Sequence, residues 1–179
     1  MKQEVMDWLE HWLFDHLTCD TVTPSSLVTG TSLKEFEVRQ LAVDFIYAGL
    51  ASKMLDLLPQ GVLFGGGELG FHGPLDYANE LMRFNPFEFD DLLAGRAAWG
   101  GPQIALSKDG IDLLSSFGLK FSETYGEDKE DRRQRFLVEM IRRFEEVGVQ
   151  LGDIAYIRAP SSFDVADFGA SRPAVKHKN

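Results

Sequence analysis

Apolar residues recur every three or four positions near the start of the chain, and acidic residues stand between them. The apolar positions are Val5, Trp8, Leu9, Trp12, Leu13 and Leu17. This spacing puts one apolar stripe along an α-helix, so it predicts an amphipathic helix with a buried stripe. A connector is predicted over 19–31, because Thr23-Pro24-Ser25-Ser26 and Thr29-Gly30-Thr31 are typical of turns and loops.

A second helical pattern begins near residue 33. Ser32 and Glu35 have the spacing of a capping box, in which each side chain accepts a hydrogen bond from the other residue's amide. The apolar positions that follow are Val38, Leu41, Ala42, Phe45 and Ile46, continued by Leu50, Met54, Leu57 and Leu58. Gly49 either interrupts this helix or permits close packing, and Pro59-Gln60-Gly61 ends it.

The middle of the chain predicts a helix, a strand and another helix. Pro74 suits a first helical turn, and that helix ends before Asn85-Pro86. Residues 103–106 are typical of a short strand, after which Ser107 caps a helix that Gly118 ends. Asp109-Gly110 also permits a hairpin turn, but the helical period of the apolar residues favours strand then helix.

The C-terminal third predicts a charged helix and a last strand. The helix opens within 123–135, continues through apolar positions to Phe144 and meets Gly148, and the strand covers 154–157. Residues 159–179 are expected to be a loosely ordered tail. The predicted fold is α+β and mostly helical, with a few short strands, an additional long helix and a single domain over 1–158.

Composition and charge indicate which class of partner the protein can bind. The chain has 179 residues, of which 44% are hydrophobic, and a formal net charge of -10. That is enough apolar material for a core, and a surface of this sign repels nucleic acid and anionic membranes but attracts basic proteins. Cys19 is the single cysteine. With no signal peptide or membrane-spanning run in the sequence, we expect a cytoplasmic protein.

A glycine-rich stretch raises the question of nucleotide binding. Gly65, Gly67 and Gly70 fit the G-x-G-x-x-G spacing. A phosphate site needs these glycines between a strand and a helix of a βαβ unit, whereas here they follow a long helical region and hold Glu68, whose charge repels phosphate. We therefore expect a turn, or a hairpin between 62–64 and 69–71, and no bound cofactor.

Histidines and acids supply the candidates for chemistry. His11 and Asp15 have the i to i+4 spacing at which two side chains can share a metal, but His11 and His16 are five apart and are expected to point away from each other. We therefore expect a solvated helix face and no metal site. His72 with Glu68 or Asp76 is the best acid–base grouping, and it is the basis of an alternative function as a small hydrolase or transferase.

Aromatic residues alternate with acids in Phe84-Asn85-Pro86-Phe87-Glu88-Phe89-Asp90-Asp91. Such a segment suits a basic protein partner, with aromatic anchors and carboxylates that steer association, unless the phenylalanines belong to the core. The residues predicted to bind the partner are Glu68, Asp76, Phe87, Glu88, Phe89, Asp90 and Asp91. The arginines at 132, 133, 135, 142 and 143 alternate with acids, which predicts a salt-bridged surface helix.

Two segments resemble a known family. Residues 37–58, EVRQLAVDFIYAGLASKMLDLL, resemble the helix pair of small bacterial winged-helix-like domains, and 97–114, AAWGGPQIALSKDGIDLL, resemble their closing strand and wing, with a turn over Leu106–Gly110. Similar modules occur in transcription regulators and in small acidic immunity proteins encoded beside bacterial toxins. The resemblance implies a winged-helix-like core over 33–117.

Acids outnumber bases over 33–117, which disfavours DNA binding. We therefore expect a non-enzymatic immunity protein that neutralises a basic toxin. The further alternative is an acidic winged-helix regulator.

Overall fold

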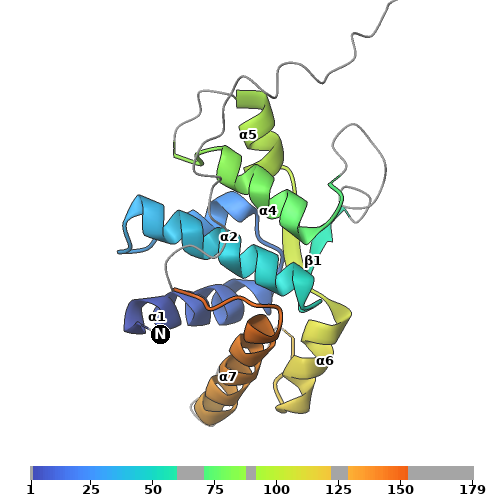
Figure 1. Ribbon diagram of the computed structural model, residues 1–179. Coiled ribbons are helices and arrows are strands. Elements are labelled where there is room, and N and C mark those ends of the chain that lie inside the picture. The colour runs from blue at the N-terminus through green and yellow to red at the C-terminus, as the bar shows by residue number, and fades with distance from the viewer. Residues whose placement is uncertain (1, 60–70, 88–91, 122–128, 153–179) are drawn as a thin grey trace, which may run out of the picture.

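Helices make up most of what the computed structural model describes, namely residues 2–59, 71–87, 92–121 and 129–152 (Figure 1). The helices are α1 (Gln3–Glu10), η1 (His11–Leu17), η2 (Pro24–Val28), α2 (Glu35–Ala51), α4 (Pro74–Arg83), α5 (Leu92–Trp99), α6 (Lys108–Ser116) and α7 (Glu130–Glu146). The strands are β1 (Leu55–Leu58) and β2 (Gln103–Leu106), which pair antiparallel. The predicted α+β, mostly helical fold is confirmed.

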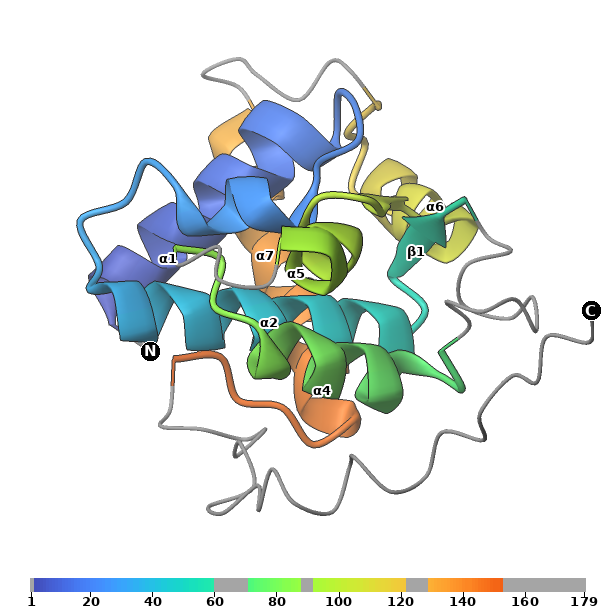
Figure 2. The same ribbon diagram turned by 90° about the horizontal axis from the view of Figure 1, so that it is seen from above.

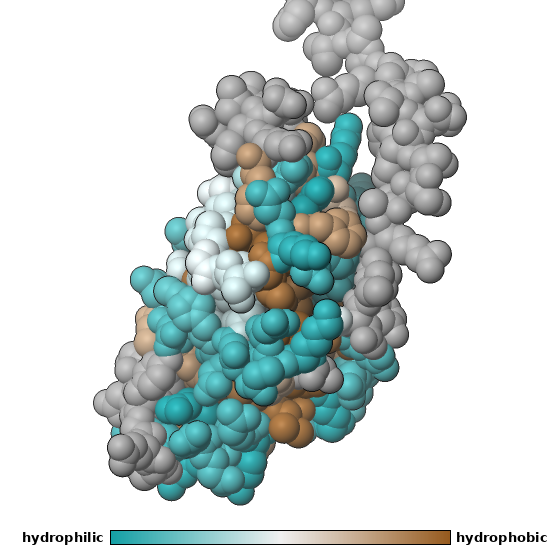
Figure 3. Space-filling model, turned by 90° about the vertical axis from the view of Figure 1, so that its left-hand side faces the viewer, coloured by the Kyte–Doolittle hydropathy of each residue, from teal (hydrophilic) through white to brown (hydrophobic). Residues whose placement is uncertain are grey.

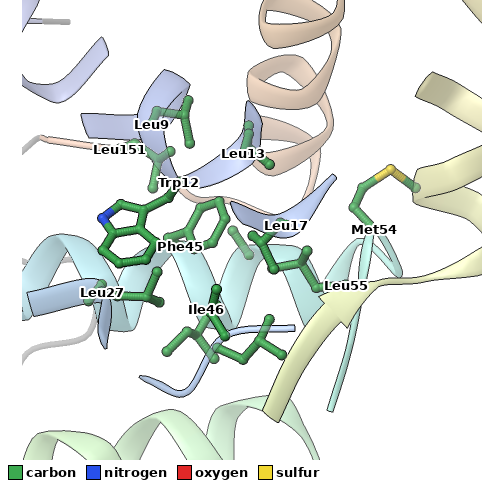
Figure 4. Packing of buried hydrophobic residues seen from close by; sticks show 14 of the residues in the cluster. Leu9, Trp12, Leu13, Leu17, Leu27, Phe45, Ile46, Met54, Leu55 and Leu151 are labelled. Carbon is green, nitrogen blue, oxygen red and sulfur yellow. The ribbon is translucent and has the colours of Figure 1, made fainter. Parts of the chain in front are cut away.

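Helix α2 is the centre of the packing. It lies between α1 on one side and α4 on the other in both views (Figures 1 and 2). Its Phe45 meets Trp8 of α1 edge to face at 5.5 Å between ring centroids, and Phe144 of α7 at 5.9 Å. Figure 4 shows side chains of the first helices pointing toward α2. The first and last helices therefore share one core with the middle of the chain.

The buried stripe predicted for the first helix is confirmed, but its second half is a π-helix. Trp12, Leu13 and Leu17 of η1 are all buried. The amide of Thr18 donates to the carbonyl of Leu13 at 2.9 Å, a step of five residues instead of the four of an α-helix. The wider turn also buries Phe14, which the helical pattern left out.

Helix α2 begins two residues later than predicted, and the predicted capping box is wrong. The residue before its first turn is Lys34, and its amide donates to a Glu37 carboxylate oxygen at 3.4 Å. The helix also ends at Ala51, because Leu55–Leu58 forms β1 and does not continue the helix. Gly49 permits close packing, since a Cβ there would lie 2.3 Å from Cδ1 of Leu55.

Strand β2 lies between two partners. On one side it pairs with β1 in the register Leu55 with Leu106 and Leu57 with Ile104, and on the other side Ile104 exchanges backbone hydrogen bonds with Val22. The predicted connector therefore supplies a bridge to the sheet and the short helix η2. The strands are linked through α4 and α5, and the winged-helix detail stays a prediction.

The other predicted boundaries agree with the structure, except that α5 forms between the predicted helix at Pro74 and the predicted strand at 103–106, where no helix was predicted. Pro74 opens α4, and the Ser107 hydroxyl accepts a hydrogen bond from the Gly110 amide at 3.0 Å as the cap of α6. Gly118 follows α6 with φ +72°, a left-handed conformation that glycine adopts readily. The strand predicted over 154–157, the tail over 159–179 and most of the glycine-rich turn lie outside the described residues.

Buried aromatic side chains join α4 to α5. The Tyr77 hydroxyl donates to the Ala98 carbonyl at 2.8 Å, and Trp99 Nε1 donates to the carbonyls of Leu81 and Phe84, both at 3.0 Å. Burial raises the pKa of the Tyr77 phenol well above its ordinary value, so this hydroxyl keeps its proton. The Trp99 bonds satisfy carbonyl groups at the end of α4, and the Tyr77 bond satisfies one at the end of α5.

The prediction of a salt-bridged helix is confirmed for α7. Glu139 binds Arg142 at 2.7 Å and Arg143 at 3.1 Å, and Arg142 also pairs with Glu146. Arg133 lies 3.8 Å from Glu10, which links α7 to α1. The arginines of this helix are therefore largely neutralised by neighbouring carboxylates.

Glu139→Gln is expected to weaken the fold by up to about 1 kcal/mol at neutral pH, because the ion pairs it removes are partly exposed. The hydrogen bond from Arg142 lowers the pKa of Glu139 to about 2 from 4.5. A lowered carboxyl pKa stabilises the fold above pH 4.5, and that contribution is lost as the pH falls toward 2. Urea unfolding of wild type and variant between pH 7 and pH 3 measures it.

The difference between wild type and Glu139→Gln should shrink as the solution becomes more acidic. Glu145→Gln is the matched control, since Glu145 is exposed on the same helix and forms no ion pair with the described residues. A difference of constant size at every pH would contradict this assignment.

Candidate binding surface

Two of the seven residues predicted to bind a partner are described by the structure, Asp76 and Phe87. Glu68, Glu88, Phe89, Asp90 and Asp91 lie outside the described residues, so their role stays a prediction. Asp76 lies in the first turn of α4, whereas Phe87 follows the other end of this ten-residue helix. A helix of that length spans about 15 Å. These two residues therefore flank α4 at its opposite ends.

Asp76 is exposed and holds the entry into α4. Its Oδ2 accepts a hydrogen bond from the backbone amide of His72 at 2.9 Å. The contact therefore involves the main chain of His72 and not its imidazole, which is itself exposed. This bond stabilises the loop before the helix, and the negative charge suits the positive end of the helix dipole.

Phe87 is half-buried and packs against the core. Its amide donates to Asn85 Oδ1 at 3.1 Å, which fixes the turn after α4. Phe87 therefore belongs in part to the core, which is the alternative that the sequence left open for the phenylalanines of this segment. A half-buried ring offers a partner less contact area than a fully exposed one.

The first turn of α2 presents an aromatic side chain that the sequence reasoning missed. Phe36 is 64% exposed, the largest value among the exposed large apolar side chains of the described residues. Glu35 and Glu37 flank it, and both are exposed. The alternation of acid and aromatic that predicts a binding segment at 84–91 also occurs in Glu35-Phe36-Glu37.

The N-terminal ends of α1 and α2 lie side by side, since Lys2 Nζ is 3.9 Å from Glu37 Oε1. We call this region the N-terminal face and define it by Glu4, Asp7, Glu35, Phe36 and Glu37. Figure 3 looks onto this side of the molecule and shows brown apolar surface between teal polar areas. The face thus combines an exposed aromatic ring with carboxylates.

Charge on the N-terminal face is less neutralised than charge on α7. Glu4 and Glu35 form no ion pair with any residue that the structure describes. Lys2 and Lys34 are the exposed cations nearby in the chain, against four carboxylates. The dipole of α2 explains why Glu35 and Glu37 stand in its first turn, but it gives no reason for an exposed Phe36 between them.

The expectation that His11 and His16 point away from each other is wrong. Their ring centroids are 4.8 Å apart, because the π-helical turn brings residues five apart to one face. His11 Nδ1 is also hydrogen-bonded to Asp15 Oδ2 at 2.6 Å. No group of three or more metal-binding side chains occurs in the part of the chain that the structure describes.

Within that same part of the chain, no helix is both long enough and apolar enough to span a membrane. No protein-family model, no curated protein and no solved structure matches this sequence or fold.

Proposed function

We propose that this protein is a non-enzymatic, acidic binding protein that neutralises a basic protein partner in the cytoplasm. The specific function that we propose is that of an immunity protein against a secreted bacterial toxin. The observation that carries the proposal is the exposed ring of Phe36 between the exposed carboxylates of Glu35 and Glu37, of which Glu35 forms no ion pair with the residues that the structure describes. A net charge of -10 supports the same choice of partner.

The chemistry of such a pair is complementary. A nuclease toxin needs a cationic cleft to hold phosphate, and carboxylates of an inhibitor can occupy the phosphate positions. Long-range attraction between opposite charges accelerates encounter, and a buried aromatic side chain supplies most of the affinity at the centre of an interface. On one turn of helix, Glu35 and Glu37 provide the negative charge and Phe36 provides the aromatic side chain.

The test uses the protein encoded beside this reading frame. Expression of that neighbour alone should arrest growth, and co-expression with this chain should restore it. The purified proteins should form a complex whose association slows as salt rises, which stopped-flow mixing from low to high ionic strength measures. A neighbour that is harmless, or one that stays toxic and forms no complex, would contradict the proposal.

A further inference from the structure

The π-helix η1 brings two imidazoles together on the surface. His11 and His16 meet edge to face, with ring planes at 90° and centroids 4.8 Å apart. In an α-helix residues five apart project in different directions, so this contact depends on the extra residue in the turn. His11 is exposed and His16 half-buried, so both are open to solvent.

The separation of the rings matches that of two imidazoles on one metal ion. With metal–nitrogen bonds of about 2.0 Å and angles between about 90° and 110°, the centroids of two such ligands lie roughly 4.5–5.2 Å apart. Rotation of a histidine ring about its Cβ–Cγ bond moves the nitrogens but leaves the centroid nearly in place, and this torsion is soft. The observed 4.8 Å therefore allows both rings to turn a nitrogen toward a common ion.

Asp15 prepares one of the two nitrogens. It lies 2.6 Å from His11 Nδ1, so in the neutral imidazole that nitrogen is the donor and Nε2 keeps the lone pair that can bind a metal. A carboxylate behind a metal-binding histidine is the usual arrangement around metal ions, because it fixes the tautomer and makes the ligand more basic. Asp15 thus acts on the ion through His11.

We propose that His11 and His16 bind a divalent transition-metal ion, with Cu²⁺ preferred over Zn²⁺, and that water completes the coordination. Imidazole nitrogen favours these ions, and Cu²⁺ forms the stronger complexes at a given nitrogen site. Two protein ligands suffice for this site, which is consistent with the absence of a three-ligand group in the described residues. The site is independent of the proposed partner.

Trp12 lies directly beside this site and can report on it. Its ring centroid is 4.5 Å from that of His16, with planes tilted by 30°, and 5.1 Å from that of His11. Paramagnetic Cu²⁺ at this distance should quench the indole emission, whereas diamagnetic Zn²⁺ should not. Occupancy is therefore visible without a label.

The experiment titrates the full chain with CuCl₂ and follows tryptophan emission and electron paramagnetic resonance. We expect the first equivalent of Cu²⁺ to quench the tryptophan emission. Its electron paramagnetic resonance spectrum should show two nitrogen ligands. His11→Ala and His16→Ala should each weaken the affinity for this Cu²⁺ ion at least about tenfold, and Asp15→Asn should weaken the affinity by a smaller factor. Zn²⁺ should displace the ion only in large excess.

His72→Ala is the matched control, because His72 is an exposed histidine away from η1. It should bind the first equivalent as wild type does. Circular dichroism of each variant identifies any that fails to fold, and His11→Gln and His16→Gln then replace the alanine variants. Equal binding by wild type and the His16 variants, or a spectrum with a single nitrogen ligand, would overturn the proposal.

Discussion

Gly110→Ala is expected to lower the free energy of unfolding by about 3 kcal/mol, since a β-carbon has no room at this position of α6. It would lie 2.4 Å from the backbone oxygen of Met54 and 3.3 Å from Cδ2 of Leu106. The Met54 oxygen is not free to move, because it accepts the amide of Ser107 at 3.0 Å. The turn between α2 and β1 would therefore have to shift away from α6.

Gly95→Ala is the matched control, as it also adds a methyl group to a helical glycine. The nearest atom to its new β-carbon would be Cβ of Phe84 at 3.5 Å, an ordinary contact. Alanine favours a helix over glycine by up to about 1 kcal/mol, so this variant should be as stable as wild type or more so. Urea unfolding followed by circular dichroism compares the two. Equal midpoints for both variants would show that the contact with Met54 is not limiting.

If the proposed function holds, Phe36→Ala is expected to weaken binding to the proposed basic partner about 30-fold, mainly through faster dissociation, while leaving stability nearly unchanged. The reason is that Phe36 is 64% exposed and contributes little to the core. Val138→Ala is the control, because Val138 of α7 is 63% exposed and lies outside the N-terminal face. Surface plasmon resonance with the partner found by co-expression provides the rate constants.

Glu35→Lys should act on the other rate constant. Reversing a charge at the rim slows association and makes it less sensitive to salt, whereas dissociation changes little. If both variants bind as wild type does, the N-terminal face is not the interface, and residues 87–91 become the next to be mutated. That outcome corrects the site alone, because the complex itself would still have formed.

Local signals with a strong stereochemical basis located most helices. The stripe from Val5 to Leu17 is buried, Pro74 opens α4, and Ser107 caps α6. In each case the residue type is strongly preferred at the position of the helix where the structure places it. The α+β, mostly helical fold could therefore be predicted without any long-range information.

The remaining features depend on tertiary contacts. Leu55, Leu57 and Leu58 fit a helical period as well as a strand, and pairing with β2 decides for the strand. No residue type in η1 distinguishes a π-helical turn, whose hydrogen bonds span five residues, from an α-helical turn, whose hydrogen bonds span four. The apolar stripe of α2 begins at Val38 and does not include Phe36, and the exposure of a lone aromatic ring is visible only in the folded molecule.

The packing of the two ends of the described chain has a consequence for biosynthesis. Gly152 lies against Val5, where an added β-carbon would be 3.0 Å from Cγ2, and Leu151 lies beside Leu9 (Figure 4). A ribosome makes the first helix long before α7, with a delay of roughly ten seconds at ordinary elongation rates. During that interval Val5 and Phe14, whose ring lies 5.8 Å from that of Phe136 in α7, lack their final cover, so nascent chains of this protein should be clients of ribosome-associated chaperones.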